Sequence, residues 1–351
     1  MKRAARVLAT ILFALIAPAT ASASNFTGSW IVTIDAPGVL PYRARLDIES
    51  ADEQLVAFVE NGPAPIAIDE NRIEIEVDAR DRQGFRFTRI LSGELTDNTI
   101  SGTIATNGIL ETAAEHGENG APWRAERLEN VAAEATGGYE LEDFTGTWIG
   151  VRGVDLRKYS MALTERAEQW VAAYDARMDE PQKRCVSPGL VAAATWIFPF
   201  EVVADTRHER LVFLYEAFGL SRRIHVDTPE LPEFYPESSM GYSRARFQDG
   251  ILDIETTLLA PSTRDFNGEP VGENARITER YFLTDDGNQL NLVMHLHDPD
   301  NYRRPPIRRR AWQRNDDALI FPFECDPDSF FRQLYSEGQM QDYIDRSHMR
   351  P

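Results

Sequence analysis

The sequence contains 351 residues, of which 42% are hydrophobic and 26% charged, and its formal net charge is −19. This composition is that of a folded globular protein, and it excludes a largely disordered chain or a coiled coil. The excess of acidic side chains repels the phosphates of nucleic acids and of anionic lipids, so we expect neither as a partner. At roughly 150 residues per domain, the length predicts two folded units.

The N-terminus has the pattern of a secretory signal peptide. Lys2, Arg3 and Arg6 precede an apolar run over residues 7–17, and the small residues at 21–23 form a cleavage site. We therefore expect residues 1–23 to be removed and the protein to be periplasmic or secreted. An uncleaved anchor is the alternative, but it would need a longer apolar run, and no later run in the sequence has the length of a membrane span.

One short motif opens two regions of the sequence. Phe-Thr-Gly-Ser-Trp at residues 26–30 recurs as Phe-Thr-Gly-Thr-Trp at residues 144–148, and an alternating apolar stretch follows each copy. The region 24–128 shows short runs of period two, separated by turns with Asn and Gly. This pattern predicts an antiparallel β-barrel-like domain, and the region resembles a lipocalin-like domain. Residues 129–143, rich in Ala, Glu and Gly, are interpreted as a linker.

The second region, residues 144–328, combines strands with one helix. Apolar residues at helical spacing over 163–178, with Thr164 as N-cap, predict an amphipathic helix packed on the barrel. A C-terminal helix is expected within residues 329–351. The expected strands are residues 148–151, 198–203, 211–217, 222–227, 241–247, 251–258, 275–283, 289–297 and 307–314. The predicted fold class is mainly β, with two tandem antiparallel β-barrel-like domains of the lipocalin or calycin type.

The two cysteines are far apart in the sequence. Cys185 and Cys325 each lie beside a turn that contains proline. In an exported chain, an even number of cysteines predicts a structural disulfide. A reactive thiol is the alternative.

A set of short motifs in the second region carries a resemblance to other proteins: residues 185–189, Arg223-Ile224, Asp227, 241–247, 255–257, Glu279-Arg280, Asp298-Pro299, Tyr302 and Pro305. Through them, residues 160–328 resemble a widespread family of exported bacterial proteins without an established activity. Two differences from the family pattern stand out: Tyr242 and Phe247 replace a usual His and Trp, and Val271 replaces a usual His. Chemistry that depends on those histidines would therefore be lost or changed.

Acidic residues of the second region are candidates for proton transfer. Asp253 and Glu255 share one face of a predicted strand, and Glu279 lies on a nearby strand, so we expect carboxylates to converge inside or at the mouth of the barrel. Glu255, Glu279 and Tyr242 are the predicted catalytic residues. Cross-strand ion pairs are the alternative; the arginines available for them are Arg222, Arg223, Arg246, Arg276 and Arg280.

A dense group of arginines over residues 303–314 suggests binding of an anionic group, because a guanidinium grips a carboxylate, sulfate or phosphate with two donors. Balancing of acids on neighbouring strands is the alternative. The predicted ligand-binding residues of the whole region are Arg223, Ser243, Arg246, Thr256, Arg280, Tyr302 and Arg304.

Two histidines are weak candidates for a metal site. His295 and His297 would share a strand face, but no further ligand is fixed by the sequence. We therefore expect no metal and no cofactor. The leading hypothesis is a β-barrel protein that binds a small or elongated organic ligand. The alternative is a metal-independent lyase, isomerase or hydrolase; the sequence predicts no oligomeric state.

Overall fold

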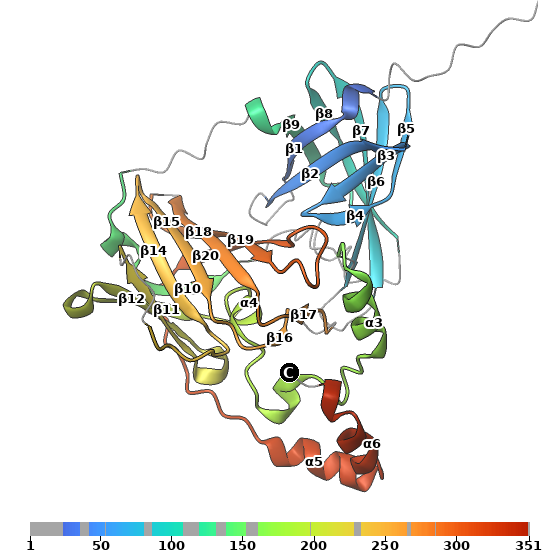
Figure 1. Ribbon diagram of the computed structural model, residues 1–351. Coiled ribbons are helices and arrows are strands. Elements are labelled where there is room, and N and C mark those ends of the chain that lie inside the picture. Colours follow the sequence, from blue (N-terminus) through green and yellow to red (C-terminus); the bar gives the residue numbers. More distant parts are fainter. Residues whose placement is uncertain are drawn as a thin grey trace, which may run out of the picture.

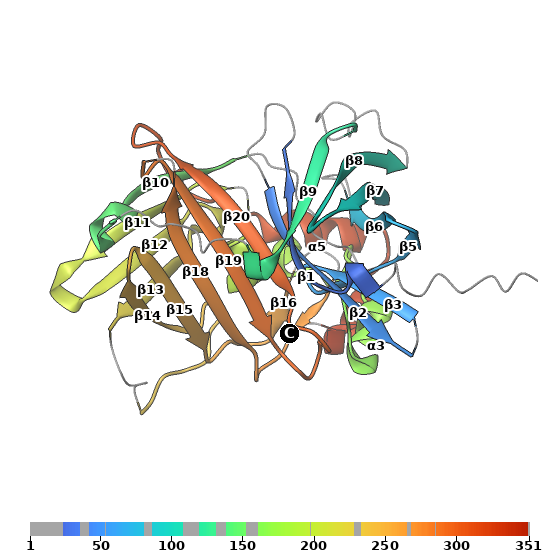
Figure 2. The same ribbon diagram turned by 90° about the horizontal axis from the view of Figure 1, so that it is seen from above.

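The strands form two barrel-like sheets, over residues 28–127 and 146–314, which lie side by side (Figure 1 and Figure 2). The mainly β fold with two barrel-like units is therefore confirmed. The predicted signal peptide lies outside the described residues. The computed structural model describes residues 24–35, 42–52, 54–80, 86–107, 119–130, 138–151, 161–196, 198–227, 233–264, 268–284 and 286–349.

The first unit is a nearly closed sheet of nine strands in the order β4-β3-β2-β1-β9-β8-β7-β6-β5. All its pairings are antiparallel, as the period-two runs predict. Its strands are β1 (Gly28–Ile34), β2 (Tyr42–Ala51), β3 (Gln54–Val59), β4 (Gly62–Ala64), β5 (Ile66–Asp69), β6 (Arg72–Arg80), β7 (Arg86–Thr96), β8 (Thr99–Asn107) and β9 (Pro122–Arg127).

The second unit is a closed barrel in the order β10-β11-β12-β13-β14-β15-β18-β19-β20, beside a small hairpin of β16 and β17. Its strands are β10 (Gly146–Gly150), β11 (Phe200–Asp205), β12 (Arg210–Tyr215), β13 (Ser221–Val226), β14 (Tyr242–Gln248), β15 (Ile251–Thr257), β16 (Ser262–Thr263), β17 (Pro270–Val271), β18 (Arg276–Thr284), β19 (Gln289–His297) and β20 (Ile307–Arg314).

One pairing in this barrel differs from the antiparallel arrangement that the sequence predicts. β13 runs parallel to β14, with Ile224 beside Ser243 and Val226 beside Ala245. A parallel pair requires a connection that returns to the other end of the sheet, and the chain between β13 and β14 is long enough to do so.

Burial alternates along the strands and divides each barrel wall into an inner and an outer face. In β19, every second residue from Leu290 to Leu296 is buried, whereas the residues between them are half-buried. The buried residues of the two units form two separate hydrophobic cores. Each barrel therefore encloses its own core.

The repeated motif builds the same contact at the start of both units. In the first, the Trp30 indole Nε1 donates a hydrogen bond to the Phe26 carbonyl at 2.9 Å. The Arg127 guanidinium lies 4.4 Å from the centre of the Trp30 ring, and its Nη1 donates to the Thr27 carbonyl at 2.9 Å. Because Trp30 and Arg127 are neighbours in the β1–β9 register, this contact ties the first strand to the last.

In the second unit, Trp148 donates to the Phe144 carbonyl at 3.0 Å, and the Arg314 guanidinium lies 4.5 Å from the Trp148 ring. Arg314 Nη1 donates to the Thr145 carbonyl at 2.6 Å. Gly146 has a φ of 118°, and a Cβ there would come 2.7 Å from Arg314 Nη1, so this close approach requires glycine. We call these two contacts the Trp–Arg latches.

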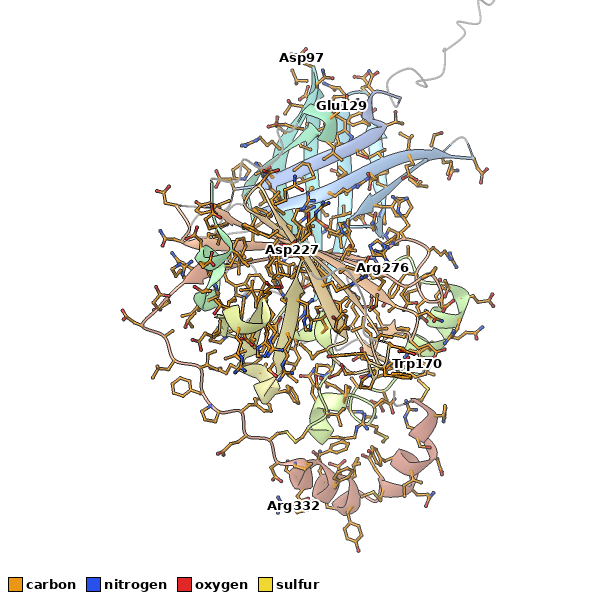
Figure 3. All side chains as sticks on the ribbon, turned by 60° about the vertical axis from the view of Figure 1, so that its left-hand side comes forward. Asp97, Glu129, Trp170, Asp227, Arg276 and Arg332 are labelled. Atoms are coloured by element: carbon orange, nitrogen blue, oxygen red, sulfur yellow. A yellow bond between two sulfur atoms is a disulfide. The ribbon has the colours of Figure 1, made fainter. Side chains whose placement is uncertain are left out.

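Two helices flank the second barrel. α3 (Glu165–Ala173) begins where predicted, and the Thr164 hydroxyl caps it by accepting a hydrogen bond from Ala167 N. It packs beside the β16–β17 hairpin, where Trp170 Nε1 donates to the Gly268 carbonyl at 3.0 Å. Trp170 is labelled in Figure 3, and the hairpin strands are labelled in Figure 1.

α4 (Leu190–Ala193) was not predicted, because four residues are too few to show a helical period. Leu190, Val191 and Ala193 are buried in the hydrophobic core of the second barrel, together with Met240 and Val271. Figure 1 shows α4 at the end of the barrel that is nearest to β16 and β17. This helix therefore fills that end of the barrel.

The predicted disulfide is present. Cys185 and Cys325 are bonded, with their Cα atoms 5.8 Å apart, and they join the segment before α4 to the segment after β20. The C-terminal part folds into α5 (Pro327–Ser336), α6 (Met340–Asp345) and the short turn η7 (Ser347–Met349). The fully buried Asp179 carboxylate accepts hydrogen bonds from Arg346, which docks these helices onto the chain before Cys185.

The two units meet where the β3–β4 turn approaches the start of β20. The Arg304 guanidinium lies 3.9 Å from the centre of the Phe58 ring and donates to Glu49 at 2.9 Å. Arg309 donates from Nε to Glu60 at 2.8 Å. The joint is therefore made largely of arginines of the second unit and acids of the first. No helix among the described residues is long and apolar enough to cross a membrane.

We predict that Arg314→Met lowers the free energy of unfolding of the second unit by about 2–4 kcal/mol, because it removes a cation–π contact and hydrogen bonds to three backbone carbonyls. Urea titration followed by tryptophan fluorescence measures this change. The control is Arg223→Met, which alters an exposed residue of β13 and should change stability by less than about 0.5 kcal/mol. Equal midpoints for the two variants would contradict the role of the latch.

Candidate functional site

A cluster of polar side chains lies inside the second barrel. Arg222 of β13 and Glu279 of β18 form an ion pair whose side chains are 1% and 0% exposed. Arg222 Nη1 donates to Glu279 Oε1 at 2.9 Å, and Nη2 donates to Glu279 Oε2. Arg222 also donates from Nε to Ser243 at 2.9 Å and from Nη2 to Thr256 at 2.8 Å. The guanidinium is thus bound to a carboxylate and two hydroxyls from three other strands.

Strand register brings these residues to one place. Ser243 faces Thr256 across the β14–β15 pair, and the two hydroxyls are 2.9 Å apart. Ile254, which shares the inner face with Thr256, lies opposite Glu279 on β18. The parallel pairing of β13 with β14 places the start of β13, with Arg222, beside the same end of the barrel.

Two tyrosines complete the cluster. The Tyr281 hydroxyl donates to Glu279 Oε1 at 3.2 Å. The Tyr215 hydroxyl makes no regular hydrogen bond with the described residues, but it lies close enough to Arg222 and Tyr281 to interact with them electrostatically. Burial raises the pKa of Tyr215 to about 12 and that of Tyr281 well above its ordinary value, to which the Glu279 carboxylate also contributes. Both hydroxyls therefore stay protonated at neutral pH, and that of Tyr281 donates to Glu279.

Apolar and cationic groups surround the cluster. Phe213 lies 5.5 Å from Tyr281 and Phe200 lies 5.6 Å from Tyr215, measured between ring centroids. Arg308 and Arg310 stand opposite Met294 and Leu292 in the β19–β20 register, on the inner face of the wall. Three arginines and Glu279 thus face the interior at this end of the barrel, and Arg310 donates to the Thr195 carbonyl just after α4.

The expectation that Glu255 and Glu279 converge is wrong. Glu255 lies opposite Thr278, one residue before Glu279, and neighbouring residues of a strand point to opposite faces. Its half-exposed carboxylate accepts hydrogen bonds from Arg244 at 3.1 Å and Arg276 at 3.0 Å on the outside of the barrel. Glu255 therefore forms cross-strand ion pairs, which was the alternative to a catalytic role.

Tyr242, the third predicted catalytic residue, also lies away from the cluster. It is buried on the outer side of β14, with its ring stacked on His225 at 4.9 Å and in edge contact with Tyr235 at 4.6 Å. Burial raises its pKa. The structure places Tyr242 under the loop that precedes β14 and not in the barrel interior.

The predicted ligand-binding residues lie at four different places. Ser243 and Thr256 belong to the inner cluster. Tyr302 is buried and donates to the Pro270 carbonyl beside the β16–β17 hairpin, and Arg304 belongs to the joint between the units. The remaining three face outward on the barrel wall, and they are Arg223, Arg246 and Arg280, the last paired with Asp253 at 2.8 Å.

Sequence reasoning considered Arg222 only as a partner for acids, and it missed Tyr215, Tyr281, Arg308 and Arg310 as interior residues. The available signal was the alternation of side chains along each strand, which places every second residue on the same face. Which of the two alternating sets faces inward depends on how distant strands pair, so the alternation alone could not identify the interior residues.

The two candidate metal ligands lie on the outer face near the joint. The rings of His295 and His297 are 6.2 Å apart, and His297 Nε2 is 2.9 Å from the Thr278 hydroxyl. Among the described residues, no group of three or more His, Cys, Asp or Glu side chains could hold a metal ion. Burial lowers the pKa of His295 to about 4, and the nearby Arg309 guanidinium contributes to the shift.

The comparisons with known proteins leave the family open. No family model and no curated protein matches the sequence. Among solved structures, the chain is similar to Aeromonas veronii immune modulator A at 9% identity and a TM-score of 0.23, over 82% of this chain and 94% of that one. A similarity of this size carries no argument, and the resemblance to a family of exported bacterial proteins stays a prediction.

We predict that Arg222→Met alone lowers the free energy of unfolding by about 3–5 kcal/mol, because it leaves the Glu279 charge buried without its partner. The double variant Arg222→Met with Glu279→Leu should recover most of this loss, since apolar pairs of similar volume replace buried ion pairs at little cost. Denaturant titration of both variants measures the difference. A single variant as stable as the wild type would show that the pair is not buried.

A pH dependence follows from His295. Its ordinary pKa is 6.5, so below that pH the unfolded chain takes up a proton that the folded chain accepts only near pH 4. The stability that neutral His295 contributes is therefore present above pH 6.5 and is lost as the pH falls towards 4, by on the order of 3 kcal/mol. In His295→Gln the loss over this interval should be smaller, whereas the exposed control His348→Gln should keep the wild-type slope. Unfolding titrations from pH 7 to 4 measure both.

Proposed function

We propose that the protein is an exported binding protein whose second barrel holds a small organic ligand against the cluster around Arg222. The observation that carries this proposal is the buried Arg222–Glu279 pair with its four hydroxyl neighbours, set inside a closed barrel. Ligand sites in proteins combine apolar walls with a few convergent polar groups, and the mouths and interiors of barrels are common places for them.

The energetics of the pair support a role beyond stability. Two fully buried charges lose their hydration, and an apolar pair of similar volume would stabilise the barrel as well or better. Four N–H groups of Arg222 are used by Glu279, Ser243 and Thr256, which fixes the guanidinium rigidly. The Tyr215 hydroxyl beside it is buried and makes no regular hydrogen bond within the described part of the chain, so it offers a donor to an acceptor group of the ligand, such as a carbonyl or carboxylate.

The same contacts disfavour the alternative of a lyase, isomerase or hydrolase. Both oxygens of Glu279 accept hydrogen bonds from Arg222, and Glu255 lies on the other side of the wall. The raised pKa values of Tyr215 and Tyr281 keep their protons in place. Neither Glu279 nor Glu255 is therefore placed to act as a free base inside the barrel, whereas recognition through fixed donors needs no base.

Export is part of the proposal and rests on two features of the chain. Residues 1–23 have the pattern of a cleaved signal peptide. The Cys185–Cys325 disulfide is of the kind that persists in oxidising compartments. A periplasmic or secreted location, with a small molecule as the partner, is consistent with both.

The test is native mass spectrometry of the mature protein purified from its own cell envelope, read beside the denatured mass. We expect a retained non-protein mass, and a denatured mass that shows cleavage after Ala23 and an oxidised cysteine pair. Saturable binding of a dansylated fatty acid and of anilinonaphthalene sulfonate, two probes with an acidic group on an apolar body, is measured in parallel by fluorescence.

Two variants make the test specific. The double variant Arg222→Met with Glu279→Leu should bind the probes at least about tenfold more weakly while it remains folded. Arg223→Met, on the outer face of the same strand, should bind as the wild type does. A clean apo mass together with no saturable probe binding would overturn the binding proposal and favour the enzyme alternative.

A further inference from the structure

The chain between β20 and α5 runs as an extended segment over the outside of the second barrel. It passes the turn η6 (Ala217–Gly219) on its way to α5 (Figure 1). Figure 3 shows Arg332 of α5 at the opposite end of the molecule from Asp97, the turn between β7 and β8, so the segment leads away from the first unit. We call residues 315–326 the acidic–aromatic strap.

The strap presents large apolar side chains to solvent. Leu319 is 72% exposed, Phe321 is 65% exposed and Phe323 is 39% exposed. They occupy every second position of the segment. Phe198, just before β11, is 45% exposed on the same unit. Exposed apolar residues that gather on a folded protein mark candidate interaction surfaces.

Aromatic contacts anchor the strap through Phe323 and leave Leu319 and Phe321 exposed. Phe323 stacks on Phe218 of η6, with the ring centroids 4.5 Å apart. Trp196 lies 5.7 Å from Phe218 and 5.9 Å from Phe198, so these rings continue the surface beyond the strap. The result is a row of aromatic rings that begins on the strap and ends beside the start of β11.

The strap is held at both ends. At its start, Arg314 belongs to the Trp–Arg latch of the second unit, and the Asn315 backbone N donates to the Thr147 carbonyl at 2.9 Å. At its end, Cys325 is bonded to Cys185. Between them, Phe321 N donates to the Glu216 carboxylate at 3.1 Å. These attachments keep Leu319 and Phe321 from folding back onto the barrel.

The charge of the strap is of one sign. Residues 315–331 contain five acidic side chains and neither Lys nor Arg. Asp317 and Glu324, which flank the exposed apolar residues, have no ion-pair partner within the part of the chain that the structure describes. Acidic residues on both sides of an apolar row complement a partner that alternates apolar and basic residues.

We propose that the acidic–aromatic strap is a docking site for a basic, amphipathic segment of a partner protein. Charge complementarity selects this occupant. A second copy of the strap would bring acidic side chains against acidic side chains, and an anionic lipid surface would be repelled in the same way. The extended strap also offers backbone groups beside its apolar side chains, which suits pairing with an extended peptide.

The test uses the mature full-length protein and a fluorescein-labelled peptide of alternating Lys and Leu residues, with binding followed by fluorescence anisotropy. We expect saturable binding that weakens as salt rises. The variant that combines Leu319→Ser with Phe321→Ser should bind about tenfold or more weakly, since it removes two anchors of the surface. Asp317→Asn with Glu324→Gln should bind more weakly and show a shallower salt dependence.

The control variant is Phe234→Ser, which removes an equally exposed apolar ring outside the strap and should bind as the wild type does. The control peptide has Glu in place of Lys and should not bind. Equal binding of the two peptides, or wild-type binding by the Leu319 and Phe321 variant, would overturn the proposal. Self-association of the protein, or binding to vesicles of phosphatidylglycerol, that the same variant abolishes would assign the strap to a second copy or to lipid and would also overturn it.

Discussion

In both units the first strand of the chain pairs with the last, and the Trp–Arg latch fixes that pairing; in the second unit this pairing is part of the closed barrel, whereas in the first it lies in the middle of a nearly closed sheet whose edges are β4 and β5. Trp30 stands beside Arg127 in the β1–β9 register, and Trp148 beside Arg314 in the β10–β20 register. In each latch the indole and the guanidinium bind carbonyls of the turn that precedes the first strand. The turn, the first strand and the last strand are therefore fixed relative to one another, and the first and last strands present no open edge where they pair.

Closure gives the wall of the second barrel two chemically different faces. Glu279 and Arg280 are adjacent in sequence, yet Glu279 pairs with Arg222 inside and Arg280 pairs with Asp253 outside. Water screens the outer pairs, whereas the inner pair interacts in a low-dielectric interior. The charges of the proposed ligand site therefore interact more strongly with one another than the ion pairs on the outer face do.

The positions of the strands could be predicted from the sequence, because period-two runs mark them; β19 and β20 have the predicted bounds. The pairing of the strands could not be predicted from the sequence, because it depends on residues that are far apart in the chain. For that reason the parallel β13–β14 pair was missed and Glu255 was expected beside Glu279. The disulfide followed from an even cysteine count, whereas α4 is too short to leave a periodic pattern. Of the residues in the cluster around Arg222, the sequence analysis predicted Glu279, Ser243 and Thr256 as site residues.

The disulfide also divides the second barrel into a covalently enclosed part and one strand outside it. Its covalent loop spans 140 residues and contains β11 through β20 but not β10, the strand that completes the wall between β11 and β20. Because the two ends of the loop are bonded, β11 and β20 stay confined to one region of space even when the barrel unfolds in an oxidised chain. β10, with Trp148, is tied to the barrel by non-covalent contacts and by the chain that follows it.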